Sequence, residues 1–212
     1  MTGTLHIAAA GAPRVVCVLA HGRGQSPEDM RSHIVGRLGA AGVAFVLPRS
    51  AGKGWYAAKA VDPLTDATRA ELDASLAQLT EAVEEARRRY PGLPLLLAGF
   101  SQGACLSLEY VCGGYPAPAA VLALTGCRVG VASDDRTARL PEGLQIWLTG
   151  SDDDPWIPLS AFADAAENLG RQKARLRAEL VPGRAHEVSD PEIGLMRQIL
   201  FGMAGANELA ET

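Results

Sequence analysis

One serine, Ser101, lies where a reaction could begin. It stands in Gly99-Phe100-Ser101-Gln102-Gly103, a G-x-S-x-G pattern between the apolar run 93–98 and a segment with helical character. A turn this sharp from strand to helix strains the serine backbone, and the flanking glycines remove the side chains that would collide there. The turn would expose the Ser101 hydroxyl as a nucleophile. Because the pattern is short, an ordinary glycine-rich turn is the alternative.

His186 is the candidate for the base that such a serine requires. A serine hydroxyl is a weak nucleophile near neutral pH, so it needs a histidine to accept its proton and a carboxylate to orient that histidine. When G-x-S-x-G forms a turn of this kind, the acid and then the histidine follow the serine along the chain. The other three histidines precede Ser101, and His186 follows the apolar run 176–181 in a glycine-containing loop.

Three adjacent carboxylates are candidates for the acid. Asp152, Asp153 and Asp154 directly follow the apolar run 144–149, and they are followed by Pro155. One carboxylate is sufficient for a triad. The others could form the loop or begin the next helix, so the residues alone leave the choice open.

Backbone N–H groups near Ser101 could bind the oxyanion that forms during acyl transfer. The first is the N–H of Gln102, the residue after the nucleophile. The second should come from a loop after an early strand, where Arg23 stands between Gly22 and Gly24. We predict that Arg23 supplies this N–H and that His21, just before it, has a structural role.

The elements that would position these groups alternate along the chain. Short runs rich in Val, Leu and Ile separate amphipathic segments, which predicts an α/β protein: a mostly parallel central sheet with helices on both faces. Strands are expected at 14–20, 43–47, 93–98, 119–124, 144–149 and 176–181. Helices are expected after Ser26, at about 65–90, and at 102–112, 159–170 and 190–203. No linker divides the chain, so we expect one domain, 1–212, with a frayed end at about 205–212.

Composition excludes several classes of protein. The chain has 212 residues and a net charge of −4, without the basic patches of a nucleic-acid-binding protein. Its four cysteines are widely spaced and form no C-x-x-C or Cys/His cluster, so we expect neither a metal site nor a disulfide framework. No apolar run is long enough to cross a bilayer and no lipidation signal is present, so we predict a cytoplasmic protein without stable membrane attachment.

Five motifs together resemble the phospholipase/carboxylesterase family of the α/β-hydrolase superfamily, which includes acyl-protein thioesterases. In order, the sequence contains "LAHGRGQSPEDM", "LPRSAGKGWY", "AGFSQGA", "GSDDDPWIP" and "PGRAHEV". They correspond to that family's oxyanion loop, substrate-side loop, nucleophile turn, acid loop and histidine loop. The resemblance implies an α/β-hydrolase fold without a large lid, and hydrolysis of esters or thioesters without a cofactor.

The resemblance also bears on the site residues. It implies a triad of Ser101, Asp154 and His186, because Asp-Pro at 154–155 resembles the acid loop of the superfamily; Asp152 is the second choice. The chain departs from the family at Arg23, where many members have a small or apolar residue. It departs again at Arg184, in the histidine loop, where Gly-x-Gly-His or a similar sequence is common. We expect these departures to affect substrate preference rather than the triad.

Three aromatic residues are candidates for substrate contact. Trp55 and Tyr56 match an aromatic pair in the family's substrate-side loop, and Trp156 is adjacent to the favoured acid. Each could instead pack against its own loop. The expected partner is a small-molecule ester or thioester, and a homodimer is left open.

We therefore expect a serine esterase that forms an acyl-enzyme on Ser101. A lactone hydrolase of the dienelactone type and an acyl-protein thioesterase are alternatives within the same chemistry. A catalytically silent binding module would be expected to lack one member of the triad, and none is missing.

Overall fold

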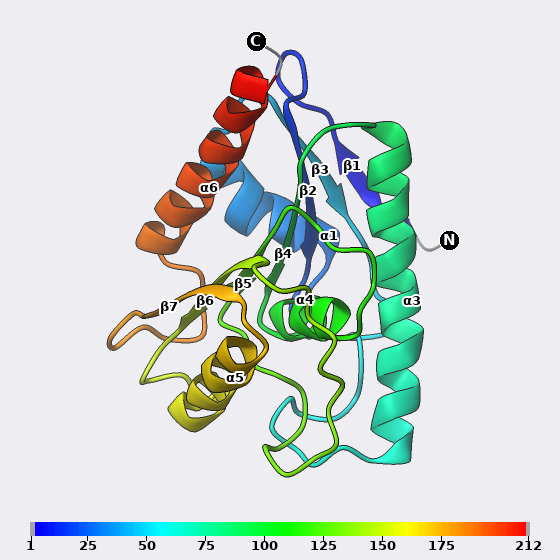
Figure 1. Cartoon of the computed structure of the whole chain (residues 1–212), viewed down its shortest axis with the longest axis vertical. Coiled ribbons are helices and arrows are strands. Elements are labelled where there is room, and N and C mark those ends of the chain that lie inside the picture. Colours follow the sequence, from blue (N-terminus) through cyan, green and yellow to red (C-terminus); the bar gives the residue numbers. More distant parts are fainter. Residues whose placement is uncertain (1–2, 211–212) are drawn as a thin grey trace.

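A seven-stranded sheet runs through the molecule in the order β1-β3-β2-β4-β5-β6-β7 (Figure 1). The computed structural model describes residues 3–210, with side chains for residues 3–205. β1 pairs antiparallel with β3, and all other neighbours are parallel. The strands are β1 (Leu5–Ile7), β2 (Val15–Ala20), β3 (Val43–Leu47), β4 (Leu95–Phe100), β5 (Ala120–Leu124), β6 (Gln145–Gly150) and β7 (Arg175–Leu180).

The six predicted strands are confirmed within two residues of their expected bounds. β1 was not predicted, because three half-buried residues at the edge of a sheet are too few to produce an alternating pattern. The expected single domain over 1–212 stays a prediction.

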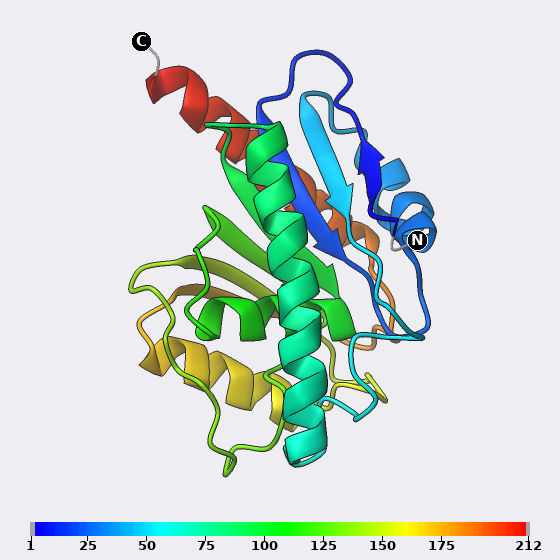
Figure 2. The same ribbon diagram turned by 90° about the vertical axis from the view of Figure 1, so that its right-hand side faces the viewer.

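Helices cover both faces of the sheet, as the sequence pattern predicts. Alternate residues of β2 belong to different cores: Val16 and Val18 pack with α3 (Asp66–Arg89), α4 (Gln102–Cys112) and α5 (Leu159–Arg171). Val15 and Cys17 pack with the helical segment 27–38 and with α6 (Asp190–Ala210). In Figure 2, α3 crosses in front of the sheet and α6 lies behind it. The sheet is therefore buried on both sides, which explains its nearly continuous apolar strands.

The first helical segment begins where the sequence indicates. The Ser26 side chain accepts a hydrogen bond from the Asp29 N–H, and Asp29 in turn accepts one from the Ser26 N–H, which forms a capping box. The segment comprises α1 (Pro27–Met30), a π-helical turn η1 (Arg31–Val35) and α2 (Gly36–Leu38).

The last helix is longer than the sequence pattern indicates. α6 continues to Ala210, beyond the expected end at 203, so the end predicted to be frayed from about 205 is helical to 210. Alanine, leucine and glutamate in this segment favour a helix. Residues 211 and 212 of that prediction lie outside the described residues.

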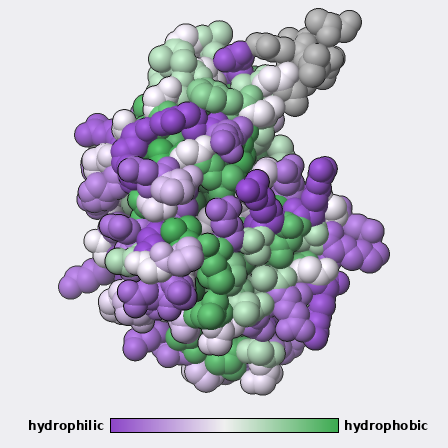
Figure 3. All heavy atoms as spheres, turned by 90° about the vertical axis from the view of Figure 1, so that its left-hand side faces the viewer, coloured by the Kyte–Doolittle hydropathy of each residue, from purple (hydrophilic) through white to green (hydrophobic). Residues whose placement is uncertain are grey.

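Figure 3 shows the side of the molecule that carries α5 and α6, where green apolar areas interrupt a largely hydrophilic surface.

None of the helices in residues 3–210 combines the length and the apolar character needed to cross a bilayer. No large lid covers the sheet in the described part of the chain; β5 and β6 are joined by an irregular loop alone.

Two glycines allow β4, α4 and β2 to meet closely at the turn that follows β4. A Cβ atom on Gly99 would lie 2.3 Å from the carbonyl carbon of Gly103. A Cβ atom on Gly103 would lie 2.3 Å from the carbonyl oxygen of Ala20 in β2. Both distances are far below van der Waals contact, and in each case the obstructing atom belongs to the backbone. Glycine at both positions is therefore a packing requirement of this turn.

Gly99→Ala should consequently destabilise the fold severely. We expect the free energy of unfolding to fall by about 3 kcal/mol or more, because backbone atoms would have to move apart. Gly194→Ala is the matched control: Gly194 lies within α6, and its Cβ would meet nothing within 4 Å. That change should stabilise the protein by up to about 1 kcal/mol. Urea unfolding of both variants measures the difference, and equal stabilities would refute the packing argument.

Candidate active site

Ser101 sits on a strained turn between β4 and α4. Its backbone angles are φ 55° and ψ −118°, a conformation that non-glycine residues rarely adopt. The Ser101 N–H donates to the carbonyl of Leu124 at the end of β5, at 2.9 Å. The Ser101 carbonyl accepts from the Cys105 N–H in the first turn of α4. Strand and helix thus hold the turn from both sides and fix the direction of the hydroxyl.

His186 approaches Ser101 from the loop that joins β7 to α6. Its Nε2 atom lies 2.7 Å from the Ser101 hydroxyl oxygen, and its Nδ1 atom lies 2.7 Å from Asp154 Oδ2. A carboxylate can only accept, so Nδ1 carries the hydrogen and Nε2 of the neutral ring can accept from the serine hydroxyl. The structure therefore brings the predicted serine, histidine and aspartate into one continuous line of hydrogen bonds.

Asp154 is held as a carboxylate beneath the histidine. Its side chain is fully buried, which alone would raise its pKa. Hydrogen bonds from the N–H groups of Ile157 and Trp156, together with the His186 ring, outweigh burial and hold the pKa of Asp154 below its usual range. The group is thus ionised at neutral pH.

The neighbouring carboxylates lie elsewhere. Asp152 is exposed and accepts a hydrogen bond at 2.7 Å from the Gly183 N–H, so it supports the histidine loop without contacting the His186 ring. Asp153 is also exposed. Of the three aspartates left open by the residues, Asp154 is the one that lies against His186.

Gln102 and Arg23 lie beside Ser101. Gln102 is the first residue of α4, so its backbone N–H has no partner within the helix. Its side chain accepts from the Trp55 N–H at 2.9 Å and donates to the Tyr56 carbonyl at 2.7 Å. These side-chain hydrogen bonds connect the serine turn to the loop at 55–56. Sequence analysis did not identify them, because a local motif contains no information about a contact 46 residues away.

A cavity of about 310 Å³ opens above Ser101. Tyr56 and Trp156 line it, together with Arg23 and His186, as the sequence analysis expected. Sequence analysis did not identify the remaining lining residues, because they come from separate loops and helices without a shared motif: Gly22, Gln25, Lys59, Ala60, Phe100, Cys105 and Ile157.

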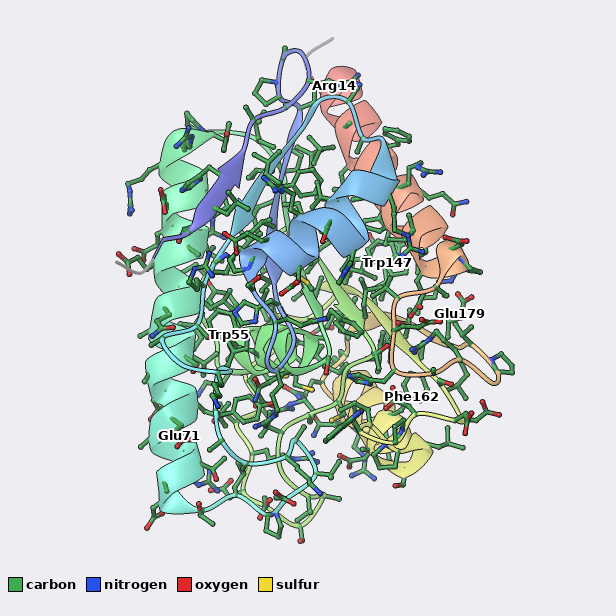
Figure 4. All side chains as sticks on the ribbon, turned by 180° about the vertical axis from the view of Figure 1, so that it is seen from behind. Arg14, Trp55, Glu71, Trp147, Phe162 and Glu179 are labelled. Atoms are coloured by element: carbon green, nitrogen blue, oxygen red, sulfur yellow. The ribbon has the colours of Figure 1, made fainter. Side chains whose placement is uncertain are left out.

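Trp55 is the exception among the expected substrate contacts. It is buried and lies outside the lining of this cavity, within the body of the molecule in Figure 4. Its indole N–H donates to the His21 carbonyl at 2.8 Å, and its ring stacks on the His21 ring. His21 itself donates from Nδ1 to Gly22 and accepts at Nε2 from the Ser50 N–H. Both residues therefore anchor loops, and burial lowers the pKa of His21 and keeps its ring neutral.

Comparison with known proteins places the chain in a hydrolase family. A family model described as serine aminopeptidase, S33, matches residues 11–151, well over half of the chain. The chain belongs to this hydrolase family. The matched part includes the turn at Ser101 and ends just before the three aspartates of the acid loop. A search of curated proteins found no match.

Solved structures similar to this S33-family chain share its whole fold. A phospholipase/carboxylesterase from Dyadobacter fermentans is 24% identical with a TM-score of 0.78, covering 95% of this chain and 97% of the other. Esterase PE8 is 20% identical with a TM-score of 0.78, covering 95% and 99%. Acyl-protein thioesterase 2 from Zea mays is 14% identical with a TM-score of 0.75, covering 96% and 100%. The predicted α/β-hydrolase fold is confirmed.

The depressed pKa of Asp154 predicts how the stability of this S33-family hydrolase depends on pH. A carboxylate whose pKa is lower in the folded than in the unfolded chain stabilises the fold above its unfolded pKa, about 3.9. This contribution is lost as the pH falls through the folded value. Wild type should therefore lose unfolding free energy more steeply than Asp154→Asn between about pH 5 and pH 3.

Urea unfolding at a series of pH values provides the measurement. Asp153→Asn, the same substitution at the exposed neighbour, should follow the wild-type slope. Parallel curves for wild type and Asp154→Asn would contradict the hydrogen-bonding account of Asp154.

Proposed function

We propose that this protein is a serine hydrolase that cleaves carboxylic esters or thioesters through an acyl-enzyme on Ser101. The line of hydrogen bonds from Ser101 through His186 to Asp154 is the observation that supports this function, and both Ser101 and His186 line the cavity. The similar folds of proteins described as carboxylesterase, esterase and acyl-protein thioesterase agree with it.

In the first half-reaction, His186 Nε2 takes the hydroxyl proton while Ser101 Oγ attacks the substrate carbonyl carbon. The carbonyl electron pair moves to oxygen, which becomes an oxyanion in the tetrahedral intermediate. As the intermediate collapses, the imidazolium gives its proton to the leaving alcohol or thiol, and an acyl-serine remains. The Asp154 carboxylate keeps the hydrogen on Nδ1 and stabilises the imidazolium.

In the second half-reaction, water takes the place of the alcohol. His186 removes a proton from the water, whose oxygen attacks the acyl-serine carbonyl. Collapse releases the carboxylic acid and returns the proton to Ser101. We assign the backbone N–H groups of Arg23 and Gln102 to bind the oxyanion in both steps, where each donor contributes about 3–4 kcal/mol in comparable hydrolases.

The cavity favours esters over the peptides that the family's description suggests. An aminopeptidase must accept a free ammonium group next to the scissile carbonyl, and a carboxylate commonly binds such a group. Among the described residues that line the cavity, none is acidic, whereas Arg23 and Lys59 are basic. A cationic amino terminus would therefore meet like charge, so we place aminopeptide hydrolysis behind ester hydrolysis.

Thioesters, acylated proteins and lactones are substrates of the same chemistry. A panel of matched oxyesters, thioesters and lactones assigns the preferred leaving group by kcat/KM.

We also propose a reducing, cytoplasmic location. The cysteines support it, because all four are buried and widely spaced in the sequence, without the pattern of a disulfide framework.

Substitution of the triad tests the proposed function directly. With p-nitrophenyl butyrate, Ser101→Ala should lower kcat by about 10⁶-fold, and Asp154→Asn by about 10⁴-fold because it favours the wrong histidine tautomer. Asp152→Asn is the matched control and should retain most activity, since Asp152 contacts the loop backbone and not the ring. Equal rates for wild type and Ser101→Ala would defeat the proposal. Loss confined to Asp152→Asn would reassign the acid.

Arg23 also forms a wall of the cavity. Its guanidinium donates to the carbonyls of Ala57, at 2.8 Å, and Ala58, and lies 5.9 Å from the centre of the Tyr56 ring. Arg23 and Tyr56 line both the cavity above Ser101 and a second hollow of about 640 Å³ on the other side, beside α3. Arg23 therefore borders both spaces. We propose that it restricts the enzyme to short acyl chains.

Arg23→Ala should therefore shift the enzyme towards longer substrates. Each added methylene that finds apolar contact contributes up to about 0.8 kcal/mol, so the ratio of kcat/KM for p-nitrophenyl octanoate to butyrate should rise at least about tenfold. The ratio cancels any loss that affects both substrates. Lys59→Ala is the control, because Lys59 lines only the smaller cavity. An unchanged ratio in Arg23→Ala would exclude this function of the side chain.

A further inference from the structure

The loop that carries His186 is fastened by a buried arginine. Arg184, only 5% exposed, donates from Nη1 to the carbonyls of Ala185 and Glu187, both at 2.6 Å. These carbonyls belong to the residues immediately before and after His186. The Arg184 carbonyl accepts from the Ser151 hydroxyl at 2.6 Å, which ties the histidine loop to the acid loop. One side chain therefore constrains the backbone on both sides of the histidine.

Arg184 is in turn anchored to the interior. Its Nη2 atom donates to the Thr125 hydroxyl at 2.7 Å, and its Nε atom lies 3.3 Å from Glu192 Oε2. Thr125 follows Leu124, whose carbonyl accepts the Ser101 N–H, and it adopts a φ of 55°. The same guanidinium thus reaches the histidine loop and the segment that holds the serine turn.

Glu192 completes the buried network. It is 2% exposed in the first turn of α6, where the helix dipole favours a negative charge. It accepts hydrogen bonds from the Thr149 hydroxyl at 2.6 Å and from the N–H and hydroxyl of Ser189. Both carboxylate oxygens therefore accept hydrogen bonds, and Glu192 balances the charge of Arg184.

The shape of the arginine side chain is essential to this arrangement. A guanidinium presents its donors in a rigid plane, so it can donate to two loop carbonyls and a hydroxyl while its charge lies beside the Glu192 carboxylate. A lysine ammonium could balance Glu192 but has three donors on a flexible stem. The network is thus more than a pair of opposite charges, and arginine and lysine should differ in their effects on the histidine.

We propose that Arg184, anchored by Glu192 and Thr125, is a positioning residue that holds His186 in line between Ser101 and Asp154. This proposal rests on the proposed serine-hydrolase function. Arg184 lies outside the lining of the cavity and would not touch the substrate. It acts on the reaction by fixing the backbone that carries the base, and a displacement of about 1 Å in such a group costs about 10²-fold in rate.

Arg184→Lys is the decisive variant because it retains the charge that Glu192 requires. We expect kcat for p-nitrophenyl butyrate to fall by about 10–100-fold. KM should stay within about twofold of wild type, and labelling by a fluorophosphonate probe should slow in parallel with kcat. If Arg184 served only to balance buried charge, both rates would remain at the wild-type level, and the proposal would be overturned.

Arg128→Lys is the matched control. Arg128 is also buried, and it pairs with Glu109 at 2.7 Å and with Asn168, away from the histidine loop. This substitution should lower thermal stability while kcat remains within about twofold of wild type. An equal loss of kcat in Arg128→Lys would mean that any weakened buried ion pair reduces activity, which would also overturn the proposal.

Thr125 provides a test that leaves the ion pair intact. Thr125→Val removes the hydroxyl that accepts from Arg184 and keeps the shape of the side chain, so we expect kcat to fall at least about threefold with KM unchanged. Thr125→Ser restores the hydroxyl and should restore kcat. Equal activity of the valine and serine variants would contradict the anchoring role, even if Arg184→Lys did not fold. Failure of the proposed function itself would be distinct, since wild type would then hydrolyse no ester faster than Ser101→Ala.

Discussion

The close approach of three backbone segments at the turn after β4 is the constraint on which the site depends. With Gly99 against Gly103, and Gly103 against Ala20, strand β4 can turn into helix α4 without an intervening loop. The residue at the corner must then adopt a positive φ, and that residue is Ser101. The strain at one serine is maintained because the sheet and the helix on either side are both buried. A looser turn would relieve the strain but would lose the fixed direction of the hydroxyl.

The proposed base, His186, cannot be fixed in the same way, because it lies on a loop after an exposed edge strand. Five of the six residues of β7 are exposed, in contrast to the fully buried β4. The loop therefore depends on polar groups instead of apolar packing, and the Arg184–Glu192 network supplies them from the interior and from the start of α6. Steric exclusion thus fixes the serine, whereas hydrogen bonds fix the histidine. The two sets of contacts share one segment of backbone: Leu124 accepts from the Ser101 N–H, and the next residue, Thr125, accepts from Arg184.

These two modes of support explain what the sequence could predict. Steric requirements produce local sequence patterns: Gly99 and Gly103 flank Ser101, and the buried strands are apolar runs between more polar segments. The serine turn and six strands were therefore predictable. Asp154 lies between similar neighbours, and its selection depends on which N–H groups surround it, here those of Trp156 and Ile157. A resemblance to an acid loop favoured it, but the residues alone could not exclude Asp152.

Polar contacts between residues far apart in the sequence produce much weaker sequence patterns. Glu192 stands in Ser189-x-x-Glu192, which predicts a helix start, yet nothing local indicates that the same carboxylate also faces Arg184. Gln102 was assigned a role for its backbone alone, although its side chain joins the serine turn to the loop at 55–56. Trp55 was expected at the substrate and is instead part of the support for that loop. In each case the side chain contacts a residue far away in the sequence. Which residue that is depends on how the loops at the strand ends lie next to one another in the folded chain.

Arg23 and Arg184, the two arginines that depart from the family pattern, contact different parts of the site. Both donate to loop carbonyls, so both constrain a loop backbone through a side-chain contact. Arg23 is exposed and lines both the cavity above Ser101 and the neighbouring hollow, where we propose that it limits the space available to a substrate. Arg184 is buried, and it donates to the backbone on both sides of His186. Each guanidinium presents its donors in a rigid plane, so each fixes the loop backbone that it contacts. In the proposed reaction, the geometry around the histidine can thus remain constant while the proton moves.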